Sequence, residues 1–142
     1  MAQSELPTVD LEYAFSMRIE SSGRIEFEGE MRTRTFEAPS GGEIWGPKLQ
    51  GRVVPHSGAD YASNNMMDAH MMLQAGDGTW IYMNLFGYEH SQTEDESPYF
   101  RVTPYFDTPQ GPWTWLSKTV FVGTAERHRN PDHTIMHFYE VL

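Results

Sequence analysis

The stretch that decides the fold covers residues 53–85 and reads VVPHSGADYASNNMMDAHMMLQAGDGTWIYMNL. Within it, residues 80–86 alternate between two sets of side chains with period two, which predicts a half-buried strand. Residues 67–74 are ambiguous by period and would also fit a short helix, but the hairpin-turn sequence Ala75-Gly76-Asp77-Gly78 follows them directly. We therefore interpret residues 67–74 and 80–86 as two antiparallel strands around which the rest of the chain is organised.

Further candidate strands lie on both sides of this hairpin. Residues 11–20 and 25–34 alternate with period two, and Ser21-Ser22-Gly23 predicts a turn, so we expect a second hairpin that ends at residues 39–42. Residues 43–54 are interrupted by glycine and proline, which is typical of an edge or bulged strand. After the central hairpin we expect a polar acidic loop at residues 87–98 and strands at residues 99–106, 113–124 and 133–142.

About eight strands separated by turn signals indicate an all-β fold, either a barrel or a sandwich. No segment carries a convincing helical stripe, an internal repeat or a low-complexity tract, and 142 residues suit one domain. We predict a single antiparallel β-barrel of about eight or more strands, calycin-like, over residues 1–142. A barrel of this size has room inside for its own side chains or for one small ligand.

Composition excludes several classes of function. The chain has no cysteine, so thiolate catalysis, cysteine-ligated metals and disulfides are excluded. A net charge of -10 disfavours nucleic acid as a partner, because the chain would repel phosphates. The acidic run at residues 94–96 fits an exposed loop. The first residues resemble no signal peptide and no segment is long and apolar enough to span a membrane, so we expect a cytoplasmic protein without a membrane partner.

The central hairpin carries the candidate chemistry. On a strand, Asp68 and His70 share one face, and a carboxylate beside an imidazole can orient the ring and raise its pKa. Inside a barrel such a pair could transfer a proton for an enolisation, an elimination or an addition, whereas on an outer face it would be a loose surface pair. Tyr82 and Asn84 share a face with Trp80 on the next strand and suit a substrate oxygen, unless these aromatic residues simply pack, for example at a subunit interface.

Other candidate residues lie outside this hairpin. Arg101 sits among aromatic residues and would bind a carboxylate or form a structural ion pair. Asp60 would be a base at the barrel mouth or a turn-forming residue. We assign Asp68, His70, Tyr82 and Arg101 to catalysis. The residues assigned to substrate binding are Asp60, Tyr61, Trp80, Asn84 and Trp115. We predict no metal, because the six histidines lack a compact ligand spacing, and no cofactor, because no phosphate-binding loop or dinucleotide motif is present.

Several segments, in order along nearly the whole chain, resemble the DUF3237 family, also called UPF0311. They include Gly46-Pro47-Lys48-Leu49-Gln50-Gly51, Gly58-Ala59-Asp60-Tyr61, Asp68-Ala69-His70, Asp77-Gly78-Thr79-Trp80-Ile81-Tyr82, Tyr99-Phe100-Arg101 and Phe121-Val122-Gly123. The resemblance implies a compact, self-associating β-barrel and supplies no general activity. The chain departs from the family pattern at Tyr61, where tryptophan is usual, at His70, where arginine is usual, and at Pro55-His56-Ser57, which replaces a glycine-rich segment.

These observations leave three hypotheses open. The first is a cofactor-independent acid–base enzyme, of lyase, cyclase or isomerase type, acting on a small aromatic or apolar carbonyl metabolite bound in the barrel. The alternative is a non-catalytic barrel that binds a small molecule. The third is a structural oligomer with a filled barrel. The expected partners are a small-molecule ligand and further copies of the chain, in a homo-oligomer.

Overall fold

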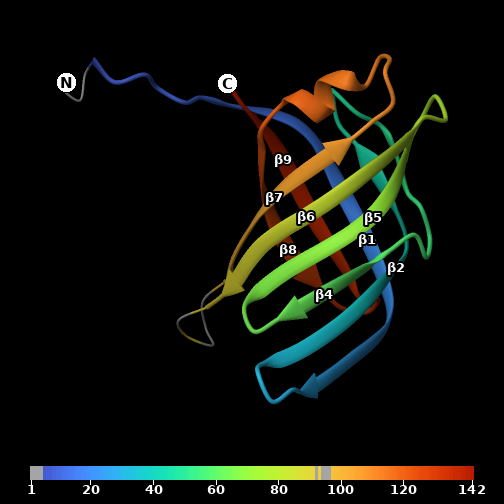
Figure 1. Ribbon diagram of the computed structural model, residues 1–142, viewed down its shortest axis with the longest axis vertical. Helices are drawn as coiled ribbons and strands as arrows, with labels where there is room; N and C mark the ends of the chain where they lie inside the picture. The colour runs from blue at the N-terminus through green and yellow to red at the C-terminus, as the bar shows by residue number, and fades with distance from the viewer. Residues whose placement is uncertain (1–4, 92, 94–96) are drawn as a thin grey trace.

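The computed structural model describes residues 5–91, 93 and 97–142, and the acidic run at residues 94–96 lies outside them. Nine strands follow one another along the described chain (Figure 1): β1 (Leu11–Glu28), β2 (Thr33–Trp45), β3 (Gly51–Val53), β4 (Ala59–Ser63), β5 (Met66–Ala75), β6 (Trp80–His90), β7 (Tyr99–Asp107), β8 (Phe121–His128) and β9 (His133–Val141). A short 3₁₀ helix, η2 (Thr114–Lys118), precedes β8. The described residues form no α-helix, and none of their helical segments is long enough to cross a membrane.

The strands form a closed antiparallel barrel. Its order is β1-β9-β8-β7-β6-β5-β3-β2-β4, and the pairing of β1 with β2 joins the two ends. Strands β3 and β4 both lie between β2 and β5, β3 beside the last residues of β2 and β4 beside its first residues. The molecule is therefore an all-β closed eight-stranded antiparallel barrel with one extra strand, and the predicted fold class is confirmed.

The central hairpin is confirmed, because β5 and β6 pair from Met66↔Tyr88 to Gln74↔Trp80 across the predicted turn. The predicted hairpin near the N-terminus is wrong. β1 runs without a break through Ser21-Ser22-Gly23, and two register shifts in its pairing with β2 accommodate these residues. Such bulges let a long strand bend while both neighbours stay paired. The chain turns later, where the Gly29 N–H donates to the Arg32 carbonyl at 3.0 Å.

Other boundaries differ from the predicted ones because strand ends follow their pairing partners. Asp60 was interpreted as a base at the barrel mouth or a turn-forming residue, and the structure places it in β4, which pairs with both β2 and β5. The segment 113–124 contains η2 and only the start of β8. β6 extends to His90 and β8 to His128, into segments predicted as polar loop and turn. The last strand lies where it was predicted.

The barrel interior is filled in its middle by apolar side chains. Four phenylalanines, Phe15, Phe106, Phe121 and Phe138, form a ring cluster with centroids between 5.2 and 6.5 Å apart. Beside them lie Met17, Met83 and Met136, none of which is exposed to solvent. The structure thus leaves no large space for a ligand at this level, and cavities occur at the lower end of the barrel, as oriented in Figure 1, and on its outer face.

Candidate functional site

The central hairpin brings four predicted site residues together, but on the outside of the barrel. In β5 the inward positions are Met67, Ala69, Met71 and Leu73, so the intervening Asp68 and His70 point outward with about half of each side chain exposed. Asn84, opposite His70, lies 3.1 Å from its Nε2 and 3.4 Å from Asp68 Oδ1, and Tyr82 OH contacts His70 Nδ1. The prediction that these residues lie together is confirmed. The alternative in which Asp68 and His70 lie inside the barrel is wrong.

The remaining aromatic candidates lie apart from one another. Trp80 is half exposed at the start of β6, and Tyr61 is exposed on β4, where its ring packs edge-on against Phe36. Trp115 belongs to η2 and packs on Phe121, 6.0 Å between ring centroids. Among the described residues, no three His, Asp or Glu side chains converge to hold a metal ion.

Asp60, by contrast, lies inside the lower end of the barrel. It stands opposite Ala69 of β5 and Glu37 of β2, and only 8 % of it is exposed. Its Oδ1 accepts a hydrogen bond from the Asp68 backbone N–H at 3.2 Å. Burial raises the pKa of Asp60 to about 6, partly offset by the positive charge of Arg127 and by that hydrogen bond. Asp60 is therefore a carboxyl that can both take and give a proton near neutral pH.

Two charged residues beyond the predicted strand ends, Arg127 and Glu89, accompany Asp60. Arg127 continues the inward positions of β8, and its Nε donates to both carboxylate oxygens of Glu89 at 3.0 and 2.8 Å. The guanidinium lies 5.1 Å above the Phe100 ring. Arg127 and Asp60 line the same small cavity, about 20 Å³, which has room for about one water molecule. Arg127 and Glu89 each lie three positions beyond the predicted end of the strand, and the inward alternation of that strand continues to each residue.

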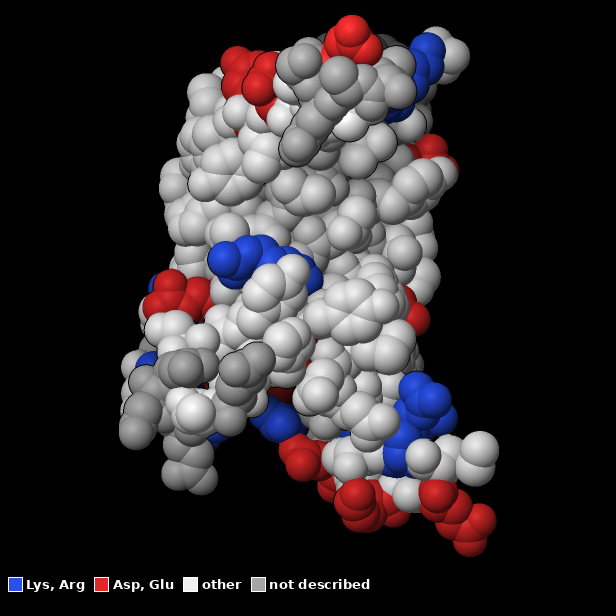
Figure 2. Space-filling view, turned by 90° about the vertical axis from the view of Figure 1, so that its left-hand side faces the viewer, with Lys and Arg blue, Asp and Glu red and all other residues white. Residues whose placement is uncertain are grey.

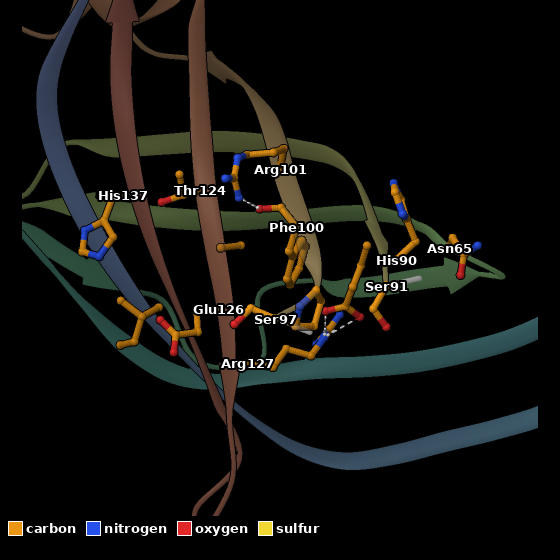
Figure 3. A pocket seen from close by; sticks show the side chains of 14 residues that line it. Asn65, His90, Ser91, Ser97, Phe100, Arg101, Thr124, Glu126, Arg127 and His137 are labelled. Carbon is orange, nitrogen blue, oxygen red and sulfur yellow. Dashed lines mark hydrogen bonds and ion pairs between the residues drawn. The ribbon is translucent and has the colours of Figure 1, made fainter. Parts of the chain in front are cut away.

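A gap in the wall lies beside this region. Strands β7 and β8 pair through Arg101↔Thr124 and Val102↔Gly123, and below these pairs they separate. The gap is a cleft of about 850 Å³ (Figure 3), lined by outward-pointing Arg101 and Thr124 as well as by inward-pointing Arg127. Arg127 thus belongs to both the cleft and the small cavity beside Asp60. Of the predicted catalytic residues, Arg101 is the one at this cleft.

A row of polar side chains crosses the outer face above the cleft. Strand register places Tyr88, Arg101, Thr124, His137 and Ser16 opposite one another across β6, β7, β8, β9 and β1. Ser16 is fully buried, and its Oγ lies 2.6 Å from His137 Nδ1. Figure 3 shows Arg101, Thr124 and His137 along one side of the cleft. This row was not predicted, because register between strands cannot be read from single segments.

An apolar groove of about 640 Å³ lies on the other side of the row. Its walls are aromatic: Tyr13 meets Tyr139 edge-on at 5.8 Å, and Phe86 meets Tyr88 edge-on at 5.2 Å. Tyr99 lies under the Arg101 guanidinium. Figure 2 shows a largely uncharged area above the middle of the face turned to the viewer, a cationic group near the middle, and more charged residues toward the two ends. The groove and the cleft share Arg101 and Thr124.

Fold and site together define a small, closed β-barrel with a filled centre and a polar lower end. A family model, DUF3237, described as a protein of unknown function, matches residues 9–141. The chain belongs to the DUF3237 family, as the sequence resemblance predicted. It is 28% identical over 155 residues to the UPF0311 protein RPA1785 of Rhodopseudomonas palustris, covering 96% of this chain and 99% of that one. The UPF0311 protein blr7842 of Bradyrhizobium diazoefficiens gives the same identity and coverage.

Solved structures share the fold. The crystal structure of RPA1785 superposes with a TM-score of 0.84 at 26% identity, covering 96% of this chain and 100% of that one. A β-barrel-like protein from Acinetobacter baumannii has a TM-score of 0.87 at 24% identity over 99% of this chain and 100% of that one. A structure described as an enzyme from Penicillium herquei has a TM-score of 0.75 at 20% identity over 97% of this chain and 98% of its own. At such identities the latter two show a common fold alone.

Proposed function

We propose that this protein is a cofactor-independent acid–base enzyme that acts on a small aromatic or apolar carbonyl compound bound at the cleft between β7 and β8. One observation carries the proposal: Asp60 is buried in a small cavity that shares Arg127 with this cleft, and its pKa is raised to about 6. A general acid or base works best when its pKa lies near the operating pH. The related barrel from Penicillium herquei is an enzyme, which supports catalysis on this fold.

The proposed chemistry divides between the two residues. The Asp60 carboxylate takes a proton from the carbon next to the substrate carbonyl, directly or through one water molecule in the adjoining space. The negative charge that develops on the carbonyl oxygen is stabilised by Arg127, whose guanidinium Glu89 holds in place. Asp60 then returns the proton to the same or another atom. This sequence is common to lyases, cyclases and isomerases that work without a cofactor.

The outer cluster of Asp68, His70, Tyr82 and Asn84 remains an alternative location for proton transfer. It contains the required groups, in contact with one another. Its half-exposed side chains lie in high dielectric, where interactions between charges are weak. Asp60 is nearly enclosed, which favours the cleft.

Exchange of α-protons for deuterium tests the proposal. A panel of aryl ketones is incubated with the protein in D₂O, and loss of the α-proton signal is followed by ¹H NMR. We expect exchange with at least one ketone, and a decrease of 10²-fold or more in Asp60→Asn, which is within the range for loss of a general acid–base group. Asp107→Asn, an exposed carboxylate on β7, is the matched control and should exchange at the wild-type rate.

The alternative is a non-catalytic barrel that binds a small molecule, and the apolar groove favours it as the second candidate. Ketones that bind without exchange in the wild type would support this alternative. Exchange that persists at the wild-type rate in Asp60→Asn would reject Asp60 as the acid–base group.

A further inference from the structure

The groove and the polar row together have the features of a binding site. Thirteen residues line the groove, and Arg101 is the one charged residue among them. The other polar groups at the junction are the hydroxyl of Thr124 and the imidazole of His137 one strand further. An isolated cation at the edge of an aromatic surface points to a ligand that has a flat apolar body and a negative group at one end.

The surroundings of Arg101 support an anionic group. One guanidinium nitrogen donates to the Phe100 carbonyl at 2.9 Å, and the Tyr99 ring lies 5.3 Å below the central carbon. These contacts fix the side chain and leave other N–H donors open. Within residues 5–91, 93 and 97–142, Arg101 forms no ion pair, although acidic residues outnumber basic ones two to one along the chain, twenty against ten. A carboxylate supplied by a ligand would accept hydrogen bonds from the open N–H donors of Arg101.

The groove is also built into the wall. Gly87 and Gly123 lie opposite Val102 from the two neighbouring strands. A Cβ at Gly123 would come within 2.8 Å of the Phe138 ring and 2.9 Å of Val102, so these glycines let Val102 sit between β6 and β8. All three residues line the groove and occupy inward positions of their strands, so the groove's base is their backbone, below aromatic walls, while Val102 packs inside the barrel.

We propose that the groove binds an aromatic carboxylate, with its ring between the walls formed by Tyr13, Tyr139 and Tyr88 and its carboxylate at Arg101. The ligand's carboxylate end would then lie next to the cleft, since Arg101 and Thr124 belong to both spaces. As a statement about the substrate the inference rests on the proposed function, whereas binding in the groove can be measured without turnover.

Isothermal titration with 2-naphthoate and the neutral isostere 2-naphthamide tests the site. We expect the wild type to bind the carboxylate at least tenfold more tightly than the amide. Arg101→Gln should remove this preference by weakening naphthoate alone, while Arg52→Gln, an exposed arginine on β3 that bonds Gln74, should retain it. Val122→Asp places a negative charge among the lining residues and should weaken naphthoate tenfold or more.

Opposite results would overturn the inference. Equal affinities for the two probes, or unchanged binding in both Arg101→Gln and Val122→Asp, would show that the groove does not recognise a carboxylate. Naphthoate that fails to bind, with a sedimenting oligomer that Val122→Asp dissociates, would assign the groove to a second copy of the chain.

The binding assay and the exchange assay test the two proposals independently. Asp60→Asn should bind naphthoate as the wild type does. Naphthoate binding without ketone exchange would reject the proposed function and leave the binding site intact. Exchange of neutral ketones without naphthoate binding would reject the site and leave the proposed function intact.

Discussion

Asp60 and Arg127 face the same small cavity at the lower end of the barrel, although they come from β4 and β8, which are not neighbours in the sheet. The carboxyl is the more buried of the two; burial raises its pKa, and the Arg127 charge and the hydrogen bond from the Asp68 N–H lower it. The arginine is itself paired with Glu89, which limits how strongly it acts on Asp60. This arrangement keeps a carboxyl with a pKa of about 6 next to a cation, and several expectations follow from it.

Removal of the Arg127 charge should raise the pKa of Asp60 above about 6, because Arg127 stabilises the ionised carboxylate. We expect this in Arg127→Gln, measured from the ¹³C chemical shift of the Asp60 carboxyl as a function of pH. Arg52→Gln is the control, since Arg52 pairs with Gln74 on the outside of the barrel. A lower pKa in Arg127→Gln would mean that the arginine does not act on Asp60 as the geometry indicates.

Asp60 should also make the folded protein less stable as the pH rises. Its pKa is about 6 when folded, against an ordinary value of 3.8, so the folded state binds more protons than the unfolded state between these values. The free energy of unfolding therefore decreases through this window, by about 3 kcal/mol for a difference of roughly two pKa units. Urea unfolding of wild type and Asp60→Asn at pH 4 and pH 8 should show this extra loss in the wild type. Equal changes in both proteins would contradict the expectation.

Strand pattern predicted the fold, but it did not predict which face of each strand lines the interior. Alternation and the turn at residues 75–78 suffice for β5 and β6, because local sequence sets both. The pattern left open which face Asp68 and His70 occupy, because β5 carries methionines on both faces, at Met67 and Met71 inside and at Met66 and Met72 outside. Closure of the barrel then decides which face is interior, and closure depends on strands far away in sequence.

Arg127 and Glu89 were missed for a related reason. Both lie beyond the predicted strand ends, and their strands extend that far because partners continue the ladder: Arg127 pairs with Thr134 and Glu89 with Phe100. Local composition there is polar and resembles a loop. Asp60 was found as a candidate, but its burial depends on β4 lying between β2 and β5, which no local pattern indicates.

Gly58 should be needed for the position of Asp60. A Cβ on Gly58 would lie 1.8 Å from the His70 carbonyl oxygen, so only glycine allows the chain to approach β5 this closely just before β4. We expect Gly58→Ala to reduce the free energy of unfolding by about 3 kcal/mol or more, because backbone atoms have to move. Gly76→Ala is the matched control, since its Cβ would meet only the Gln50 carbonyl at 3.6 Å, and its loss should be about 1 kcal/mol or less. If Gly58→Ala lowered the free energy of unfolding as little as Gly76→Ala does, β4 would tolerate a larger separation from β5.

The outer cluster allows a direct choice between the two candidate locations for proton transfer. His70→Ala removes the contacts with Tyr82 and Asn84, but the side chain is half exposed, so the free energy of unfolding should change by less than about 1 kcal/mol. If catalysis takes place at the cleft, ketone exchange in His70→Ala should stay within about twofold of the wild type, because changes distant from the reacting groups have small effects. Loss of general acid–base catalysis at His70 would instead reduce exchange about 10²-fold or more. Suppose that His70→Ala loses exchange, that Asp60→Asn is fully active, and that circular dichroism shows both variants to be folded. Proton transfer would then take place on the outer face of β5 and β6 and not at the cleft.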